Sequence, residues 1–362
     1  MNFITSHPLL ISALAAFLLS YLLIRLGVPM AKKFGLVDRP DNRKQHDGDI
    51  PVIGGIAVAM SAFIAFILFQ KLSGISILTI YILVGSTMLL ILGIIDDLHQ
   101  CNWRWRLLFQ LVISVIVLKV TGLSIHNVLG FDLTSVPGLS LGFTLLTIVG
   151  MTNAINLLDG IDGLAGGITL IAIADIFLFS SPPISLIGGA HLVILAAGLL
   201  PFLYANISGG KKIKVFLGDS GSYMLGFMVA LSLINLSVGK NPTLSHSSVL
   251  WCVAVPILDT TGVILRRLRD GRSPFYPDHG HLHHLLIKKG MSSRVALSSI
   301  LCFAVILSIS GMIIEQYLPK WSIPIFILLA LAYVSITQRQ FVLLGPMLLT
   351  SSIDKKDMEE NC

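Results

Sequence analysis

The sequence predicts an all-α polytopic membrane protein with about eleven transmembrane helices. Only 12% of its 362 residues are charged, against about 25% in a typical soluble domain. Its mean hydropathy is +0.86, and apolar runs recur that approach the roughly 20 residues a spanning helix needs. This composition excludes an ordinary soluble enzyme, a disordered protein and a DNA-binding domain. The net charge of +6 is typical of basic cytoplasmic loops in a membrane protein, so no nucleic-acid partner is expected.

The expected spans are the apolar runs at 9–29, 52–70, 75–95, 107–121, 140–156, 163–180, 187–206, 219–236, 247–265, 295–314 and 321–341. With this count, 21 of the 25 Lys and Arg residues fall in the connections on one side. Because basic loops stay in the cytoplasm, the amino terminus is expected outside and the carboxy terminus inside. Residues 1–350 are expected to form a single integral-membrane domain, and residues 351–362 a polar cytoplasmic tail.

Asp outnumbers Glu 16 to 3 and gathers at the expected cytoplasmic ends. Lys and Arg are better anchors at a membrane boundary because they snorkel, so clustered Asp side chains need another reason. A divalent cation, a basic phosphate-binding group, or both would supply it.

The pair Asp96 and Asp97 closes the third expected span, with Arg104 and Arg106 just beyond. Adjacent positions on a helix point about 100° apart, so only one of the pair can aim straight at a given centre. The alternative interpretation is that these carboxylates are simply solvated at a helix end and that the arginines only set the topology.

Four polar residues recur every third position at the end of the fifth span: Asn153, Asn156, Asp159 and Asp162. A helical backbone would place them along one side. Glycines at 160, 163, 166 and 167 indicate that the helix opens there into a polar turn.

Asp219 lies in the segment 216–222, directly after the basic loop 209–214. Its flanking glycines would let phosphates approach the backbone amides. The alternative is that Asp219 only caps the N-terminus of the helix that begins there. In the large loop 266–284, four of the ten histidines fall within six residues. A zinc site is conceivable, but no thiolate is near, and imidazoles beside arginines suit an anionic ligand better.

Together these groups predict phosphoryl transfer at the inner membrane face, between a cytosolic nucleotide and a lipid. A transporter also has many spans with polar residues inside them, but transporters place essential charges near the midplane. Here nearly all candidate groups lie toward one face, and only Asp175 and Asp259 lie well within spans.

From about Gly35 to Leu285 the sequence resembles the polyprenyl-phosphate N-acetylhexosamine-1-phosphate transferases. It is most similar to the bacterial undecaprenyl-phosphate N-acetylglucosaminyl-1-phosphate transferases. The resemblance is carried, in order, by 37–46, 50–55, the Asp96–Asp97 pair, 153–163, 216–222 and the arginine and histidine loop. One departure is Asp278-His279-Gly280, where relatives more often carry a basic residue and Gln.

The resemblance implies that undecaprenyl phosphate attacks UDP-N-acetylglucosamine, with Mg²⁺ as cofactor or Mn²⁺ in its place. It implies a multi-pass protein of the bacterial inner membrane, initiating a surface polysaccharide such as O antigen, and leaves a homodimer open. The alternatives are another UDP-N-acetyl sugar, including UDP-MurNAc-pentapeptide. The implied roles are metal binding by Asp219 and Asn156, catalysis by Asp96, Asp97, Asp159 and His281, and substrate binding by Arg106, Asp162, Phe216, Arg267, His283 and His284.

Overall fold

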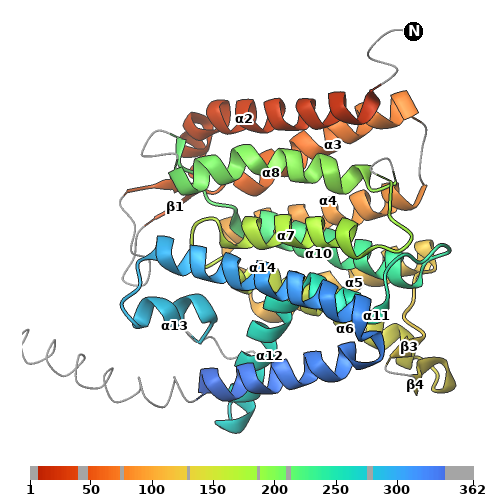
Figure 1. Ribbon diagram of the computed structural model, residues 1–362. Coiled ribbons are helices and arrows are strands. Elements are labelled where there is room, and N and C mark those ends of the chain that lie inside the picture. Colours follow the sequence, from red (N-terminus) through yellow and green to blue (C-terminus); the bar gives the residue numbers. More distant parts are fainter. Residues whose placement is uncertain are drawn as a thin grey trace, which may run out of the picture. The chain divides into compact units, whose positions relative to one another are not determined.

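The computed structural model describes residues 7–39, 48–73, 77–128, 131–185, 188–208, 213–274 and 280–338. It divides into two compact units, the first ending at Cys252 and the second beginning at Val253. Helices dominate both units (Figure 1). Those of the first are α2 (Pro8–Phe34), α3 (Gly54–Ser73), α4 (Ile77–His99), α5 (Trp103–Thr121), α6 (Leu139–Leu158), α7 (Leu164–Phe179), α8 (Ala190–Ser208), α10 (Gly218–Val238) and α11 (His246–Cys252). Those of the second are α12 (Ala254–Arg269), α13 (Leu282–Lys288), α14 (Ser293–Tyr317) and a last helix, Pro319–Gln338, that opens as the 3-10 turn η2 (Pro319–Trp321).

Eight helices in the described part of the chain are long and apolar enough to cross a membrane, or nine if α11 and α12 form one span. The chain is therefore an all-helical, multi-pass membrane protein, as the composition predicts. The other two expected spans coincide with α5 and α7. The first carries three basic residues in its 19, and the second is only 16 residues long.

Helix α10 is the centre of the first unit, where it packs against α3, α4, α6 and α7. Glycines allow these close approaches, since in lipid small residues let helix backbones approach each other. A Cβ at Gly226 would lie 2.7 Å from Cα of Thr152 on α6, and one at Gly93 on α4 would lie 2.3 Å from Cα of Ser220. The start of α10 is thus held directly against the end of α4.

Two short hairpins connect the helices of this unit: β1 (Val37–Asp38) pairs with β2 (Ile50–Pro51), and β3 (Asn127–Val128) pairs with β4 (Phe131–Asp132), which precedes the turn η1 (Leu133–Ser135). The first hairpin positions the chain before α10, because Pro51 accepts the N–H of Phe216 at 2.9 Å. The N–H of Gly54 in turn donates to the carbonyl of Phe216 at 2.9 Å. The segment leading into α10 is therefore fixed against the start of α3.

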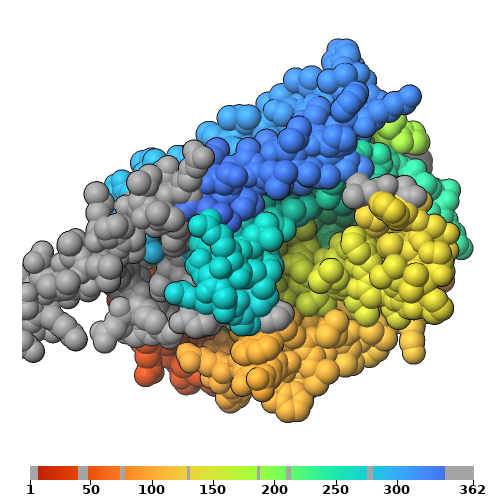
Figure 2. Space-filling view, turned by 90° about the horizontal axis from the view of Figure 1, so that it is seen from below, coloured from red at the N-terminus to blue at the C-terminus, as the bar shows by residue number. Residues whose placement is uncertain are grey.

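The outer helices of the first unit expose apolar side chains, as lipid-facing helices must. Atoms of α4 and α5 (orange) form one outer face in Figure 2. Exposed residues of these helices include Ile91, Leu108 and Phe109. Trp103 and Trp105 at the start of α5 are exposed as well, as Trp side chains at a membrane–water interface commonly are.

In the second unit, α12 packs against α14, and so does the short α13. Arg266 and Arg267 of α12 are buried in spite of their charge. The departure at residues 278–279 and the expected tail 351–362 lie outside the described residues.

Candidate active site

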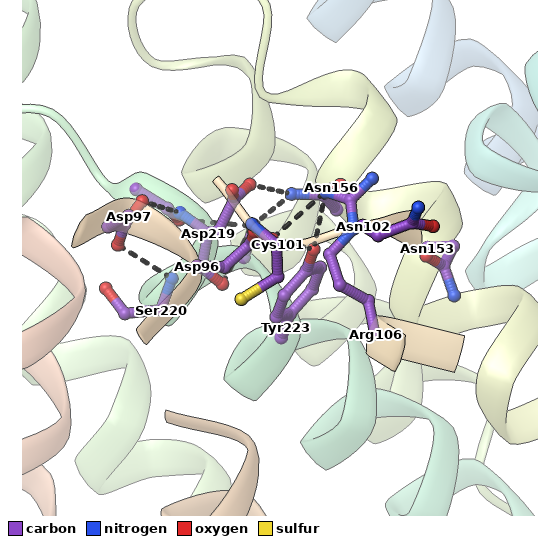
Figure 3. A network of polar contacts seen from close by, with 12 residues as sticks. Asp96, Asp97, Cys101, Asn102, Arg106, Asn153, Asn156, Asp219, Ser220 and Tyr223 are labelled. Carbon is purple, nitrogen blue, oxygen red and sulfur yellow. Dashed lines mark hydrogen bonds and ion pairs between the residues drawn. The ribbon is translucent and has the colours of Figure 1, made fainter. Parts of the chain in front are cut away.

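The sequence-remote acids Asp97 and Asp219 meet where α4 ends and α10 begins (Figure 3). Oδ1 of Asp97 accepts the backbone N–H of Asp219 at 2.8 Å, and Oδ2 accepts that of Ser220 at 3.2 Å. The first N–H groups of a helix have no partner within it, so a carboxylate is stabilising there. Asp97 thus caps α10 from another helix, where the N-cap residue Leu217 makes no side-chain cap bond of its own.

Asp96 turns away from its neighbour, as the angle between adjacent helical positions predicts. It is 3% exposed, and its Oδ2 accepts the hydroxyl of Tyr223 at 2.9 Å and the guanidinium of Arg106 at 3.0 Å. Oδ1 accepts the backbone N–H of Cys101 at 2.8 Å. Because Arg106 also donates to the Tyr223 hydroxyl at 3.3 Å, the three side chains form one network. The Arg106 side chain remains about a third exposed and can meet an anion.

Asn156 joins α6 to this network. Its Nδ2 donates to Oδ1 of Asp219 at 2.6 Å and to Oγ of Ser222 at 2.9 Å. Asn153, one helical turn earlier, donates instead to Gln110 of α5 at 2.6 Å and to the carbonyl of Val149 at 2.8 Å. Of the two asparagines, Asn156 is therefore the one beside the acids.

Helix α6 ends at Leu158, and the predicted polar turn follows. Gly163 takes φ +82°, a backbone conformation that favours glycine. Asp159 lies in this turn, where burial raises its pKa well above the usual range, and the charge of Asp219 raises it further. Within the described part of the chain, no lysine or arginine pairs with Asp97, Asp159 or Asp219. These carboxylates thus repel one another, and a proton or a bound cation would relieve that repulsion.

A second polar group of the same unit surrounds Asp162. Lys214 pairs with Asp162 at 2.6 Å, and its ammonium lies 5.8 Å from the ring centroid of Phe216. Asn206, 4% exposed, donates to the carbonyl of Val215 at 2.9 Å and to Asp162 at 3.3 Å. A half-buried aromatic face beside a lysine and an amide suits a planar, polar ring such as a nucleobase.

The arginine and histidine loop belongs to the second unit. Arg267 donates to the carbonyl of Pro274 at 2.5 Å, and Arg266 donates to that of Gly280 at 3.1 Å. His283 and His284 lie with ring centroids 4.1 Å apart. Over the residues that the structure describes, no group of three or more His, Cys, Asp or Glu side chains is arranged to hold a metal ion. The alternative of a zinc site gains no support from these histidines.

The structure thus brings together Asp96, Asp97, Arg106, Asn156, Asp159 and Asp219 on one hand, and Asp162 with Phe216 on the other. Sequence reasoning missed Tyr223, Ser222, Asn206 and Lys214. Tyr223 is one turn after Asp219, so a polar side chain at i+4 from a candidate ligand was an available signal. The sequence indicates Lys214 only as part of the basic loop 209–214.

Apolar spans that enclose an acidic cluster with a guanidinium beside it are typical of an integral-membrane protein for charged substrates, which the sequence motifs predict to be an enzyme. The comparisons with known proteins agree. The family model described as glycosyl transferase family 4 matches residues 79–237. The undecaprenyl-phosphate alpha-N-acetylglucosaminyl 1-phosphate transferase of Escherichia coli K12 is 34% identical over 346 residues, 91% of this chain and 90% of that protein.

The corresponding transferase of Yersinia pestis is 32% identical over 329 residues, 88% of both chains. A protein of Bacillus subtilis strain 168, described as a probable undecaprenyl-phosphate N-acetylglucosaminyl 1-phosphate transferase, is 35% identical over 85% of this chain and 86% of its own. The chain belongs to this transferase family, which confirms the resemblance drawn from the motifs.

Proposed function

We propose that the protein transfers N-acetylglucosamine 1-phosphate from UDP-N-acetylglucosamine to undecaprenyl phosphate, yielding undecaprenyl-diphosphate-N-acetylglucosamine and UMP. The names of relatives that match about nine-tenths of the chain support both substrates. The observation that carries the proposal is the network of Asp219, Asn156 and Arg106, which gathers metal-type oxygen ligands and a phosphate-binding cation in one place.

In this reaction an oxygen of the lipid phosphate attacks the β-phosphorus of the nucleotide sugar. A new P–O bond forms, the bridging bond between the α- and β-phosphorus breaks, and the bridging oxygen leaves with UMP. The lipid phosphate has a second pKa near 6, so most of it is already a dianion at cytosolic pH. The protein therefore has to hold two anionic groups together more than it has to remove a proton.

The residues present fit a magnesium ion. Mg²⁺ commonly binds through one or two carboxylates together with waters and substrate phosphates. Asp219, unpaired with any described lysine or arginine, would supply the carboxylate, and Asn156 would supply its amide oxygen after turning from the Nδ2 contact that it makes with Asp219 here, while Asp97 fixes the backbone of Asp219 beside them. When bound, the ion would neutralise charge on the diphosphate.

Arg106 is proposed to bind the phosphate of the acceptor, and Asp96 to hold Arg106 in place. The group around Asp162 and Phe216 is proposed to bind the uridine end of the donor. Arg267, His283 and His284 of the second unit keep their expected role in sugar and phosphate recognition, and Asp159 and His281 theirs in catalysis.

The full topology of eleven spans, with the amino terminus outside, is part of this proposal. Each expected run coincides with a helix or, for 247–265, with the pair α11 and α12. The distribution of basic residues, 21 of 25 in one set of connections, supports cytoplasmic placement of the site. A bacterial inner membrane, a single domain and a role in O-antigen or similar polysaccharide synthesis are proposed with it, and a homodimer is left open.

The test is a transfer assay in membranes containing the protein, with undecaprenyl phosphate and UDP-[³H]GlcNAc, in the presence of Mg²⁺ or of a chelator. Label that enters the lipid phase with Mg²⁺, and disappears both with the chelator and in Asp219→Ala, is the expected result. Label only with another UDP-N-acetyl sugar would correct the donor. No transfer from any UDP-sugar would overturn the proposal and favour a transporter.

A further inference from the structure

Asp259 is a buried acid of α12 that the proposed reaction does not use. Its Oδ2 accepts from Nδ1 of His281 at 2.8 Å, and both side chains are almost fully buried. Oδ1 accepts the backbone N–H of Leu282 at 2.8 Å and the hydroxyl of Tyr333 at 3.2 Å. All four residues belong to the second unit, and Tyr333 comes from its last helix.

The backbone on both sides of His281 is tied to α12. Gly280 accepts the guanidinium of Arg266 before it, and Leu282 donates to Asp259 after it. Gly280 lies so close to this guanidinium that a Cβ would fall 1.5 Å from its Nη2. Gly262, one turn after Asp259, leaves room for the Tyr333 ring, whose Cε1 would be 3.2 Å from a Cβ there. The imidazole is thus held at its ring and at its backbone.

The other ring nitrogen of His281 has no such anchor. The residue is 4% exposed, and its Nε2 is buried with no hydrogen-bond partner among the described residues. A buried polar atom without a partner costs about 1–3 kcal/mol, so a ligand that meets it recovers that cost. A carboxylate that binds one nitrogen of a histidine fixes which nitrogen is offered to a ligand.

We propose that Asp259 is the positioning residue that holds His281 with its Nδ1–H on the carboxylate, so that Nε2 is presented to a phosphate or hydroxyl oxygen of the nucleotide sugar, with Tyr333 fixing Asp259 in turn. This inference rests on the proposed function. It gives the last helix, which carries little of the family resemblance, a part in holding His281 through Tyr333 and Asp259.

The arrangement gives Nε2 two usable forms. Since Nδ1 keeps its proton on the carboxylate, Nε2 can stand bare as an acceptor or protonated as a charged donor. The isosteric change Asp259→Asn removes both of these forms of Nε2. The N–H of Leu282 is a fixed donor, so the amide oxygen must face Leu282 and Tyr333, and the amide nitrogen must face Nδ1. Nδ1 then accepts, and the ring is confined to its neutral Nε2–H form.

The experiment compares Asp259→Asn, His281→Ala and their double variant in the transfer assay. Loss of an orienting partner of this kind typically costs 10–100-fold, so kcat of Asp259→Asn should fall about tenfold or more, with KM for UDP-GlcNAc and the thermal unfolding midpoint nearly unchanged. In the His281→Ala background the same change should alter kcat by less than about twofold, because residues that act through one another are not additive. Asp270→Asn, an exposed acid just after α12, is the matched control.

The proposal would be overturned if Asp259→Asn lowered kcat by the same factor with and without His281. It would also be overturned if Asp259→Asn were as active as Asp270→Asn. If Asp259→Asn does not fold, Tyr333→Phe keeps the ring packing and must lower kcat only while His281 is present. The ring itself is read by ¹⁵N NMR of histidine-labelled protein in micelles, with His281 assigned by its loss in His281→Ala. Nε2–H in the wild type with Nδ1 unprotonated would overturn the inference. Because this reading needs no turnover, it stands even if no UDP-sugar is a substrate, which would overturn only the proposed function.

Discussion

Asp97 accepts the backbone N–H of Asp219 at 2.8 Å, so one acid of the site fixes the helix that carries the other. Asp97→Ala removes the acceptors of two α10 N–H groups, including that of Ser220. Loss of a cap costs about 0.5–2 kcal/mol. We therefore expect a lower thermal unfolding midpoint in detergent together with lost transfer. Asp97→Asn, which keeps one acceptor, should lie between, and Asp270→Ala is the control. A midpoint equal to wild type in Asp97→Ala would contradict the capping role.

Gly93→Ala should separate α4 from α10, because the new Cβ would lie 2.3 Å from Cα and 2.4 Å from N of Ser220, which are backbone atoms. A Cβ at Gly142 on α6 would meet nothing within 4 Å, so Gly142→Ala should leave stability unchanged or raise it slightly. The reason is that alanine favours the helical conformation over glycine by about 1 kcal/mol. Transfer activity and unfolding midpoints of the two variants decide this. Equal behaviour would show that the close approach of α4 to Asp219 is not needed.

The polar clusters and the helical spans could be predicted from the sequence because both are local. Apolar runs give the helices, and the glycines after Asn156 give the turn at Asp159. The directions of Asp96 and Asp97 follow from the angle between adjacent helical positions. The hydrogen-bond partners of these side chains could not be predicted from the sequence. Asn153 and Asn156 share a helix face, yet Asn153 contacts Gln110 and Asn156 contacts Asp219. Such a choice depends on how sequence-remote helices pack.

Some residues were missed for the same reason. Asn206 ends an apolar span and reads as a boundary residue, but it accepts the N–H of Gly163 at 2.6 Å and so ties α8 to the polar turn. From the sequence, Asp259 is identified only as one of two acids well within expected spans. Its bond to His281 required the fold of the second unit, which places residues 22 positions apart in contact.

Asn156→Ala should weaken the response to Mg²⁺, since the amide lies 2.6 Å from Oδ1 of Asp219. Loss of a group that ligates or orients a ligand typically costs 10–100-fold, so the Mg²⁺ concentration for half-maximal transfer should rise about tenfold or more. Asn153→Ala is the matched control, because that amide contacts Gln110 and Val149 instead. Parallel Mg²⁺ titrations measure the difference, and equal shifts would remove Asn156 from the metal site.

Lys214→Met should weaken binding of the nucleotide sugar. The change deletes the ion pair with Asp162 at 2.6 Å and the cation over the Phe216 ring, while it keeps the length of the side chain. We expect KM for UDP-GlcNAc to rise about tenfold with a smaller change in kcat, the pattern of lost uniform binding. Lys119→Met, at an exposed position of α5, is the control. A fall in kcat with unchanged KM would move Lys214 from substrate binding to the chemical step.

Asp96→Asn should lower transfer by the same factor at every pH. Asp96 already accepts from Arg106, Tyr223 and Cys101, so its oxygens are committed to holding Arg106. An amide in its place turns a donor toward one of these groups and releases the guanidinium, which we expect to cost about 10–100-fold in kcat.

The pH profile separates this role from that of a general base. The acceptor phosphate loses its last proton near pH 6, so wild type and variant should keep a constant ratio of kcat from about pH 5 to pH 8, across that titration. If Asp96 removed that proton, Asp96→Asn would instead regain activity as the pH rises, because solvent would deprotonate the acceptor in its place. Measuring kcat of both proteins across this range, with Mg²⁺ saturating, therefore decides whether the carboxylate positions Arg106 or takes the proton itself.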